Sequence, residues 1–110
     1  MADFTDLRNE FAATSDILVA LGDEHRQAII VELLKDKVCA GRQVSELTKA
    51  TRLSRPAVSH HLKVLRDAHI IEYRSEGTKN FYYLTHNTQA FAQLGALLVS
   101  VNKVLEAHEK

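Results

Sequence analysis

The sequence has little of several residue types, and each shortage excludes a class of protein. Its 110 residues include one cysteine, Cys39, and one proline, Pro56. A single cysteine excludes an intramolecular disulfide and a multi-cysteine metal site within one chain. There is no glycine-rich phosphate loop, and there are no internal repeats or low-complexity segments. We therefore expect one globular domain spanning residues 1–110, about the usual domain size.

Long apolar runs and catalytic constellations are also missing. No apolar run approaches the roughly 18 residues of a membrane span. The first residues, MADFTDLRNE, lack the basic start and apolar core of a signal peptide. Cys39 has no evident base beside it, and the acids show no paired arrangement, so no catalytic residue is predicted. We expect a soluble cytoplasmic protein that is not an enzyme, uses no cofactor and does not act at a membrane.

Charge is balanced overall but unevenly distributed. The formal net charge is zero. Residues 1–30 contain six acids and two bases, whereas residues 52–80 contain six bases, three acids and three histidines. One explanation is a solvated surface with chance clustering, and the other is a basic surface for nucleic acid.

Hydrophobic periodicity predicts a mainly α-helical protein with one small β-hairpin. The pattern is helical until about residue 69, and two short runs rich in β-branched and aromatic residues, IIEYRS and KNFYYL, follow. Gly77 between them is free to adopt a positive φ, which predicts a hairpin over about 70–84. Before it, a short helix, a turn with Ser54 as cap and Pro56 in the first turn, and a longer helix occupy about 44–68. This order is that of a winged helix-turn-helix.

The first and last predicted helices, about 3–12 and 87–108, carry apolar stripes. The members are Phe4, Leu7 and Phe11 in the first helix and Phe91, Leu94, Leu98, Val101 and Leu105 in the last. A small domain with a furnished core has little need of such a long stripe at its end. A bundle with another subunit is the better explanation for the last helix.

The stretch LSRPAVSHHLKVL, residues 53–65, holds adjacent histidines that could suggest metal or nucleic acid. At about 100° per residue, His60 joins Arg55, Ser59 and Lys63 on a basic, hydroxylic face, while His61 falls within the apolar arc. Helical chelation needs a spacing such as i, i+4, so the adjacent pair is not predicted to bind metal. We expect a half-buried, hydrogen-bonded His61. The outward face would contact phosphates and base edges, or be an ordinary solvated face.

Two segments resemble the ArsR/SmtB family of bacterial winged-helix repressors. The most specific is LSRPAVSHHLKVLRDAHIIEYRSEGTKNFYYL, residues 53–84, and LGDEHRQAIIVELL, residues 21–34, is also similar. The resemblance implies a homodimer built from the first and last helices, with two recognition helices on an inverted-repeat operator in double-stranded DNA. Together with Lys63 from the helical face, the DNA-contacting positions would be Ser54, Arg55, Ala57, Ser59 and His60, with Thr78 and Lys79 at the wing.

The metal-sensing sites that the resemblance implies are not matched. Where members have two cysteines before the recognition helix, GRQVSEL has Gln43 and Ser45, and the ligand positions of the last helix correspond to His86, Thr88, Val99 and Asn102. We predict no metal site. Asp23-Glu24-His25 at a helix start needs no ligand, because acids suit the helix dipole there. His108 with Glu106 or Glu109 is better explained as a solvated helix end.

The sequence thus favours a DNA-binding transcriptional regulator, a repressor without the usual metal sites, whose effector it does not identify. One alternative is a protein-interaction module that keeps the fold without binding DNA, supported by the neutral net charge and the apolar last helix. The other is a metal-responsive repressor with an atypical site.

Overall fold

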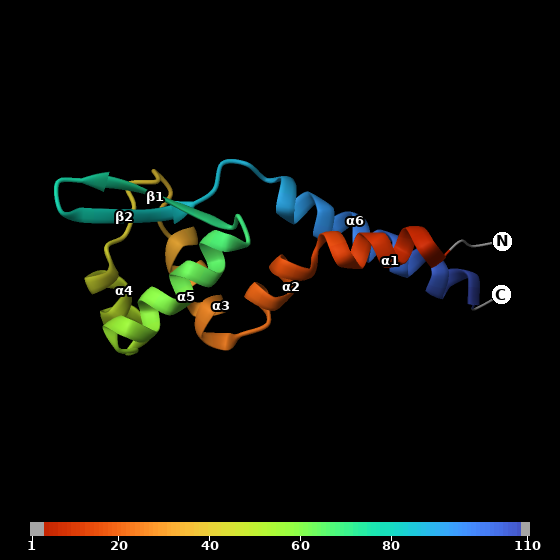
Figure 1. Ribbon diagram of the computed structural model, residues 1–110, viewed down its shortest axis with the longest axis horizontal. Coiled ribbons are helices and arrows are strands. Elements are labelled where there is room, and N and C mark those ends of the chain that lie inside the picture. Colours follow the sequence, from red (N-terminus) through yellow and green to blue (C-terminus); the bar gives the residue numbers. More distant parts are fainter. Residues whose placement is uncertain (1–3, 109–110) are drawn as a thin grey trace.

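A computed structural model describes residues 4–108 of the chain, which form six helices and a two-stranded hairpin. The elements, in order, are α1 (Phe4–Ala13), α2 (Ser15–Leu21), α3 (Glu24–Leu34), α4 (Val44–Thr51), α5 (Arg55–Asp67), β1 (Ile71–Glu76), β2 (Lys79–Leu84) and α6 (Gln89–His108). The molecule is elongated, with extents of 56 × 24 × 22 Å. Figure 1 shows a head, formed by α2–α5 and the hairpin, and an arm in which α1 lies along α6.

The predicted fold class is confirmed, and the element bounds differ from those expected by a residue or two. The helix expected over 3–12 runs from Phe4 to Ala13, residue 3 lying outside the described part of the chain. The last helix, expected from 87, begins at Gln89. The segment 44–68 holds α4 and α5, and the segment 70–84 holds β1 and β2.

Side-chain caps set where the two principal head helices begin. The Asp23 carboxylate accepts hydrogen bonds from the backbone N–H groups of His25 and Arg26 at the start of α3. The Ser54 hydroxyl accepts from the Ala57 N–H at the start of α5. Such caps satisfy backbone donors that have no partner within the helix. Arg52, with φ of 62°, ends α4 in the left-handed conformation, so a tight turn separates α4 from α5.

The main cluster of buried apolar side chains lies in the head. Its buried members are Ile17, Ala20, Ile29, Leu33, Leu47, Val58, Leu62, Leu65, Ala68, Ile70 and Ile71. Within α5, Val58, Leu62 and Leu65 are at most 1% exposed, which fixes that helix against α3 and α4. The apolar arc predicted from the helical period is therefore the side that faces the core.

The hairpin projects from the end of α5 and makes few core contacts. Its strands pair antiparallel from Ile71↔Leu84 to Glu76↔Lys79, and Gly77 turns the chain with φ of 63°. Only Ile71 of the hairpin is buried. The wing is therefore anchored at its base and exposed at its tip.

The arm buries much less than the head. Leu97 is the one fully buried residue of α6, and no residue of α1 is buried. Ser100 of α6 donates hydrogen bonds to both carboxylate oxygens of Glu10 in α1, at 3.0 and 2.8 Å. Phe91 and Leu98 remain 38% and 54% exposed.

One exclusion made from the sequence needs correction. Within the described residues, α6 is long and apolar enough to cross a membrane by length and composition alone. Its mean hydropathy is 1.2, and 6% of its most apolar segment is buried in the structure. Polar residues such as Ser100 interrupt the apolar run of α6, but the mean hydropathy of the helix still reaches that of a membrane span. A single such helix is weak evidence for a membrane, because the mostly buried core helices of soluble proteins meet the same criteria, although α6 is little buried within one chain.

Candidate nucleic-acid interface

Helix α5 presents two chemically different faces. Opposite its core side, the side chains of Arg55, Ser59, His60 and Lys63 are all exposed. Lys63 Nζ lies 3.7 Å from the Asp67 carboxylate, and both side chains are well solvated, so this pair leaves the lysine free to exchange partners. The outward face is basic and hydroxylic, as the helical period predicted.

The start of α5 holds two more of the predicted contact residues, Ser54 and Ala57. Ser54 and Pro56 are exposed, and Ala57 is half-buried, in keeping with its position at the edge of the apolar arc. Because Ser54 caps the helix at 3.3 Å, its hydroxyl is already engaged with the Ala57 N–H. Further bonding from Ser54 would use its hydroxyl proton, which the cap does not need.

The wing tip lies beside the start of α5. Thr78 and Lys79 are exposed at the hairpin turn. With Arg55 they line a small open groove of about 120 Å³, whose other lining residues are Gln43, Val44, Ser45 and Asn80. The structure therefore brings together residues from two predicted groups, the helix and the wing.

Three polar residues of this groove were missed by the sequence argument. Gln43 and Ser45 were considered only as replacements for cysteines, and Asn80 was not considered. Gln43 precedes α4, where its N–H donates to the Glu46 carboxylate, and Asn80 Oδ1 accepts from Ser75 in the opposite strand. One sequence signal could have identified Gln43. It is a polar residue directly before α4, the helix that precedes α5.

Not all bases of the segment 52–80 serve an outward surface. Arg74 is half-buried, and its guanidinium donates to the backbone carbonyls of Cys39 and Ala40. The Arg66 guanidinium lies over the Tyr73 ring, 5.1 Å from its centre. The charge count of the sequence therefore overstates the basic surface by about these two residues.

The loop before α4 is held against the hairpin. Arg42 and Tyr82 exchange two backbone hydrogen bonds of 2.8 and 2.9 Å, which add a third, short strand position to the sheet. The buried Asp36 carboxylate accepts from the Gly41 N–H at 2.7 Å. At Gly41, with φ of 90°, an added Cβ would lie 2.6 Å from Phe81 Cβ, so the loop requires glycine there. This network fixes the wing relative to α4.

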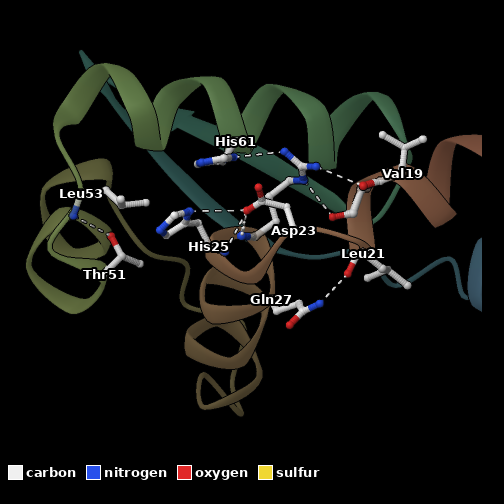
Figure 2. Close-up of polar contacts among 10 residues, drawn as sticks. Val19, Leu21, Asp23, His25, Gln27, Thr51, Leu53 and His61 are labelled. Atoms are coloured by element: carbon white, nitrogen blue, oxygen red, sulfur yellow. Dashed lines mark hydrogen bonds and ion pairs between the residues drawn. The ribbon is translucent and has the colours of Figure 1, made fainter.

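His61 faces inward, as expected, and takes part in a contact between helices. The Arg26 guanidinium lies 3.2 Å from His61 Nδ1, while its other nitrogens donate to the carbonyls of Ala20 and Val19 (Figure 2). Burial is the main reason why the pKa of His61 is lowered, and the positive charge of Arg26 acts in the same direction. Neutral His61 can then accept a hydrogen bond from Arg26.

A short helix, a tight turn, a longer helix with an exposed basic face and a projecting hairpin define a winged helix-turn-helix protein of the DNA-binding class. Comparison with known proteins agrees. A profile described as "Bacterial regulatory protein, arsR family" matches residues 23–73. An HTH-type transcriptional regulator of Methanocaldococcus jannaschii is 36% identical over 76 residues, which cover 68% of this chain and 81% of that protein.

Two further relatives bear on the fold and on the regulatory role. An arsenical resistance operon repressor of Staphylococcus aureus is 35% identical over 72 residues, 66% of this chain and 65% of its own length. The solution structure of a homodimeric winged helix-turn-helix DNA-binding domain from Mycobacterium bovis, a possible ArsR-family regulator, superposes with a TM-score of 0.60. It is 23% identical, and the match covers 100% of this chain and 95% of that one, which supports the fold.

The chain belongs to the arsR family of bacterial regulatory proteins. The predictions of a DNA-binding transcriptional regulator and of a protein other than an enzyme are confirmed, since these relatives are named as regulators and repressors. The alternative of a protein-interaction module without DNA binding is not favoured.

Proposed function

We propose that the chain is a homodimeric repressor that binds an inverted-repeat operator in double-stranded DNA, in the cytoplasm. The observation that carries the proposal is the meeting of the exposed face of α5 with the wing tip at one groove, lined by Arg55, Thr78 and Lys79. A recognition helix in the major groove and a wing on the backbone need this arrangement. The repressor role is supported by the relatives that carry that name.

The contacting residues divide by chemistry. The lysines Lys63 and Lys79 are point charges suited to phosphate oxygens, which supply affinity without sequence information. Arg55, in the first turn of α5, has the fork geometry that pairs with guanine in the major groove. The side chains of Ser59 and His60 are short. They would therefore reach base edges only if α5 lies deep in the major groove. Ser54, Ala57 and Thr78 complete the proposed surface.

The homodimer is supported by the exposed side of the arm. Phe91, Leu98 and Leu105 lie seven residues apart on α6 and are 38%, 54% and 54% exposed, and Phe4 and Phe11 of α1 show the same spacing at 58% and 46%. A seven-residue repeat keeps one stripe against a partner helix. Leu7 and Val101 are half-buried, and Leu94 packs partly against the core of its own head. These three would contribute mainly from the edge of the interface.

Fluorescence anisotropy with DNA from upstream of the chain's own gene tests the proposal. We expect saturable binding to a palindromic duplex that weakens as salt rises, because neutralised phosphates release counterions. Arg55→Ala should cost about 1–3 kcal/mol and relax discrimination at one base pair. Equal losses on every duplex would instead assign Arg55 to phosphate, and no binding at low salt would contradict the function.

A matched pair of lysine variants separates a specific surface from general charge. Lys79→Ala should weaken binding to all duplexes and reduce the salt slope by about 1. Lys103→Ala removes the same charge from an exposed position on α6, away from the wing, and should leave the slope unchanged. Equal effects of both variants would contradict the proposed placement of DNA.

A further inference from the structure

Three metal-ligating side chains meet where α3 begins beneath α5. Asp23 and His25 come from the start of α3, and His61 comes from the middle of α5. One ligand atom of each lies within 4.8 Å of the other two. Figure 2 shows the two rings and the carboxylate turned toward one another. The position of Asp23 and His25 at a helix start explains them without a ligand, and nothing in the sequence spacing connects them with His61.

We propose that Asp23, His25 and His61 form a binding site for one divalent transition-metal ion of the zinc, cobalt and nickel class. Two imidazoles and a carboxylate suit these ions, and thiolate ligands are not required. Three protein ligands leave a fourth position for water, as in open zinc sites. The ion would join the start of α3 to the recognition helix.

The site is distinct from those that the family resemblance implies. Those correspond to Gln43 and Ser45 before α4, and to His86, Thr88, Val99 and Asn102 around α6. None of these six residues belongs to the cluster. The ring centre of His60 lies 5.7 Å from that of His61, but the His60 side chain is exposed and does not belong to the cluster.

The protonation states favour the ion. A metal ion needs an ionised carboxylate and neutral imidazoles. The pKa of Asp23 is lowered, chiefly by the hydrogen bond from the Arg26 N–H. The pKa of His61 is lowered, chiefly by burial. Near neutral pH both groups are therefore already in the form that binds metal.

The geometry requires a modest contraction. Metal–ligand bonds of about 2.0–2.2 Å in a tetrahedron hold ligand atoms roughly 3.4 Å apart. His25 Nδ1 is 3.7 Å from Asp23 Oδ1, close to that value. The His25 side chain is 48% exposed, so it can rotate toward His61 without disturbing the core. The ring centres of His25 and His61 are 5.8 Å apart.

Arg26 sets the cost of binding. If the metal binds His61 Nδ1, it displaces the Arg26 Nη1 group that lies 3.2 Å from that atom. If the metal binds Nε2 instead, the ring proton of His61 moves to Nδ1, which can then no longer accept a hydrogen bond from Arg26 Nη1. Either way one hydrogen bond is lost. The guanidinium stays anchored, because Nε still donates to Ala20 at 2.8 Å and Nη2 to Val19 at 3.0 Å.

Calorimetric titration of the metal-free protein with ZnCl₂ at pH 7.5 tests the site without DNA, so its result is independent of the proposed function. We expect saturation at one ion per chain. Asp23→Asn keeps a helix-capping side chain, and His25→Ala changes an exposed one, so both variants should fold. Each should weaken zinc binding at least about tenfold, the loss typical of disturbing a metal shell.

The matched control is His86→Ala, which removes an exposed histidine at one of the positions that correspond to the family sites. It should bind zinc like the parent. At one zinc concentration, the thermal midpoint should rise more in the parent and the control than in either cluster variant, because a ligand stabilises the state that binds it by an amount that grows with its affinity. Absence of saturable binding, unchanged affinity in both cluster variants, or an equal loss in His86→Ala would overturn the site.

Discussion

The head and the arm of this molecule differ in how complete they are. All eleven members of the core cluster lie in the head, whereas α6 has one fully buried residue and α1 none. The head builds this core within one chain, although Val19, Leu34 and Val38 at its surface are more than half exposed. The arm builds almost no core, and Phe4, Leu98 and Leu105 remain more than half exposed. The contrast supports the proposed division, in which the head contacts DNA and the exposed stripe of the arm contacts a second chain.

The largest expected effect tests the self-sufficiency of the head. Leu62→Ala removes a side chain that is 1% exposed, and cavity formation should cost about 2–5 kcal/mol of the free energy of unfolding. Leu98→Ala, at a position 54% exposed within one chain, should cost less and only at concentrations at which the protein is dimeric. Urea unfolding at low and high protein concentration measures both. Similar, concentration-independent losses would contradict the division into head and arm.

The second prediction breaks the arm and spares the head. Leu98→Glu places a charge in the seven-residue stripe, which should prevent dimerisation and reduce affinity for a palindromic duplex about 10²-fold or more, as expected when two linked binding events become independent. Light scattering gives the oligomeric state, and circular dichroism checks the fold. Ala96→Glu is the control, because Ala96 is exposed on another side of α6. A monomeric Ala96→Glu, or a dimeric Leu98→Glu, would remove the stripe from the interface.

How far the sequence predicted the molecule also differs between the two regions. Within α5, the helical period separated Val58 and Leu62 from Ser59 and Lys63, because a single amphipathic helix records its own burial. In the arm, the same rule placed Leu94 in the outward stripe and omitted Leu97, the residue that is buried. α6 is apolar on more than one side, so its period alone does not show which side packs within the chain.

Contacts between distant segments were beyond local patterns altogether. The pairing of Arg26 with His61 joins residues far apart in the sequence, and so does the anchoring of Arg74 on the Cys39 and Ala40 carbonyls. Neither has a spacing rule, since each depends on how whole elements pack. The candidate DNA-contacting residues could be predicted from the sequence because they lie on one helix and one turn. The metal cluster could be found only from the folded structure, because its residues come from separate segments.

The third prediction concerns how the head orients its recognition helix. Ser54→Ala removes the hydroxyl that accepts the Ala57 N–H and should cost about 1 kcal/mol of stability. Ser59→Ala removes an equal hydroxyl from the exposed middle of the same helix and should cost close to nothing. Thermal unfolding of both variants measures the difference. Equal values would mean that the cap does not stabilise the start of α5.

The smallest expected effect separates head from arm by pH. Since the pKa of His61 is lowered in the folded state, mainly by burial, the unfolded chain binds more protons and stability falls as pH drops below the usual histidine value of about 6.5. Asp23 opposes this shift, whereas Arg26, His60 and His25 add to it. His61→Gln can still accept from Arg26 and should flatten the dependence between pH 8 and 5.5, whereas exposed His86→Gln should not.

This acid effect should act on the head alone. His61 contacts α3, whereas none of the stripe residues of α6, Phe91, Leu94, Leu98, Val101 and Leu105, is titratable. Unfolding of the head should therefore become easier in mild acid at a pH where light scattering still reports an unchanged dimer. If the dimer dissociated first, or if His61→Gln kept the parent's pH dependence, the sensitive contact would lie elsewhere. If the head loses stability in mild acid while the protein stays dimeric, then pH acts on the stability of the head and not on the association of the arm.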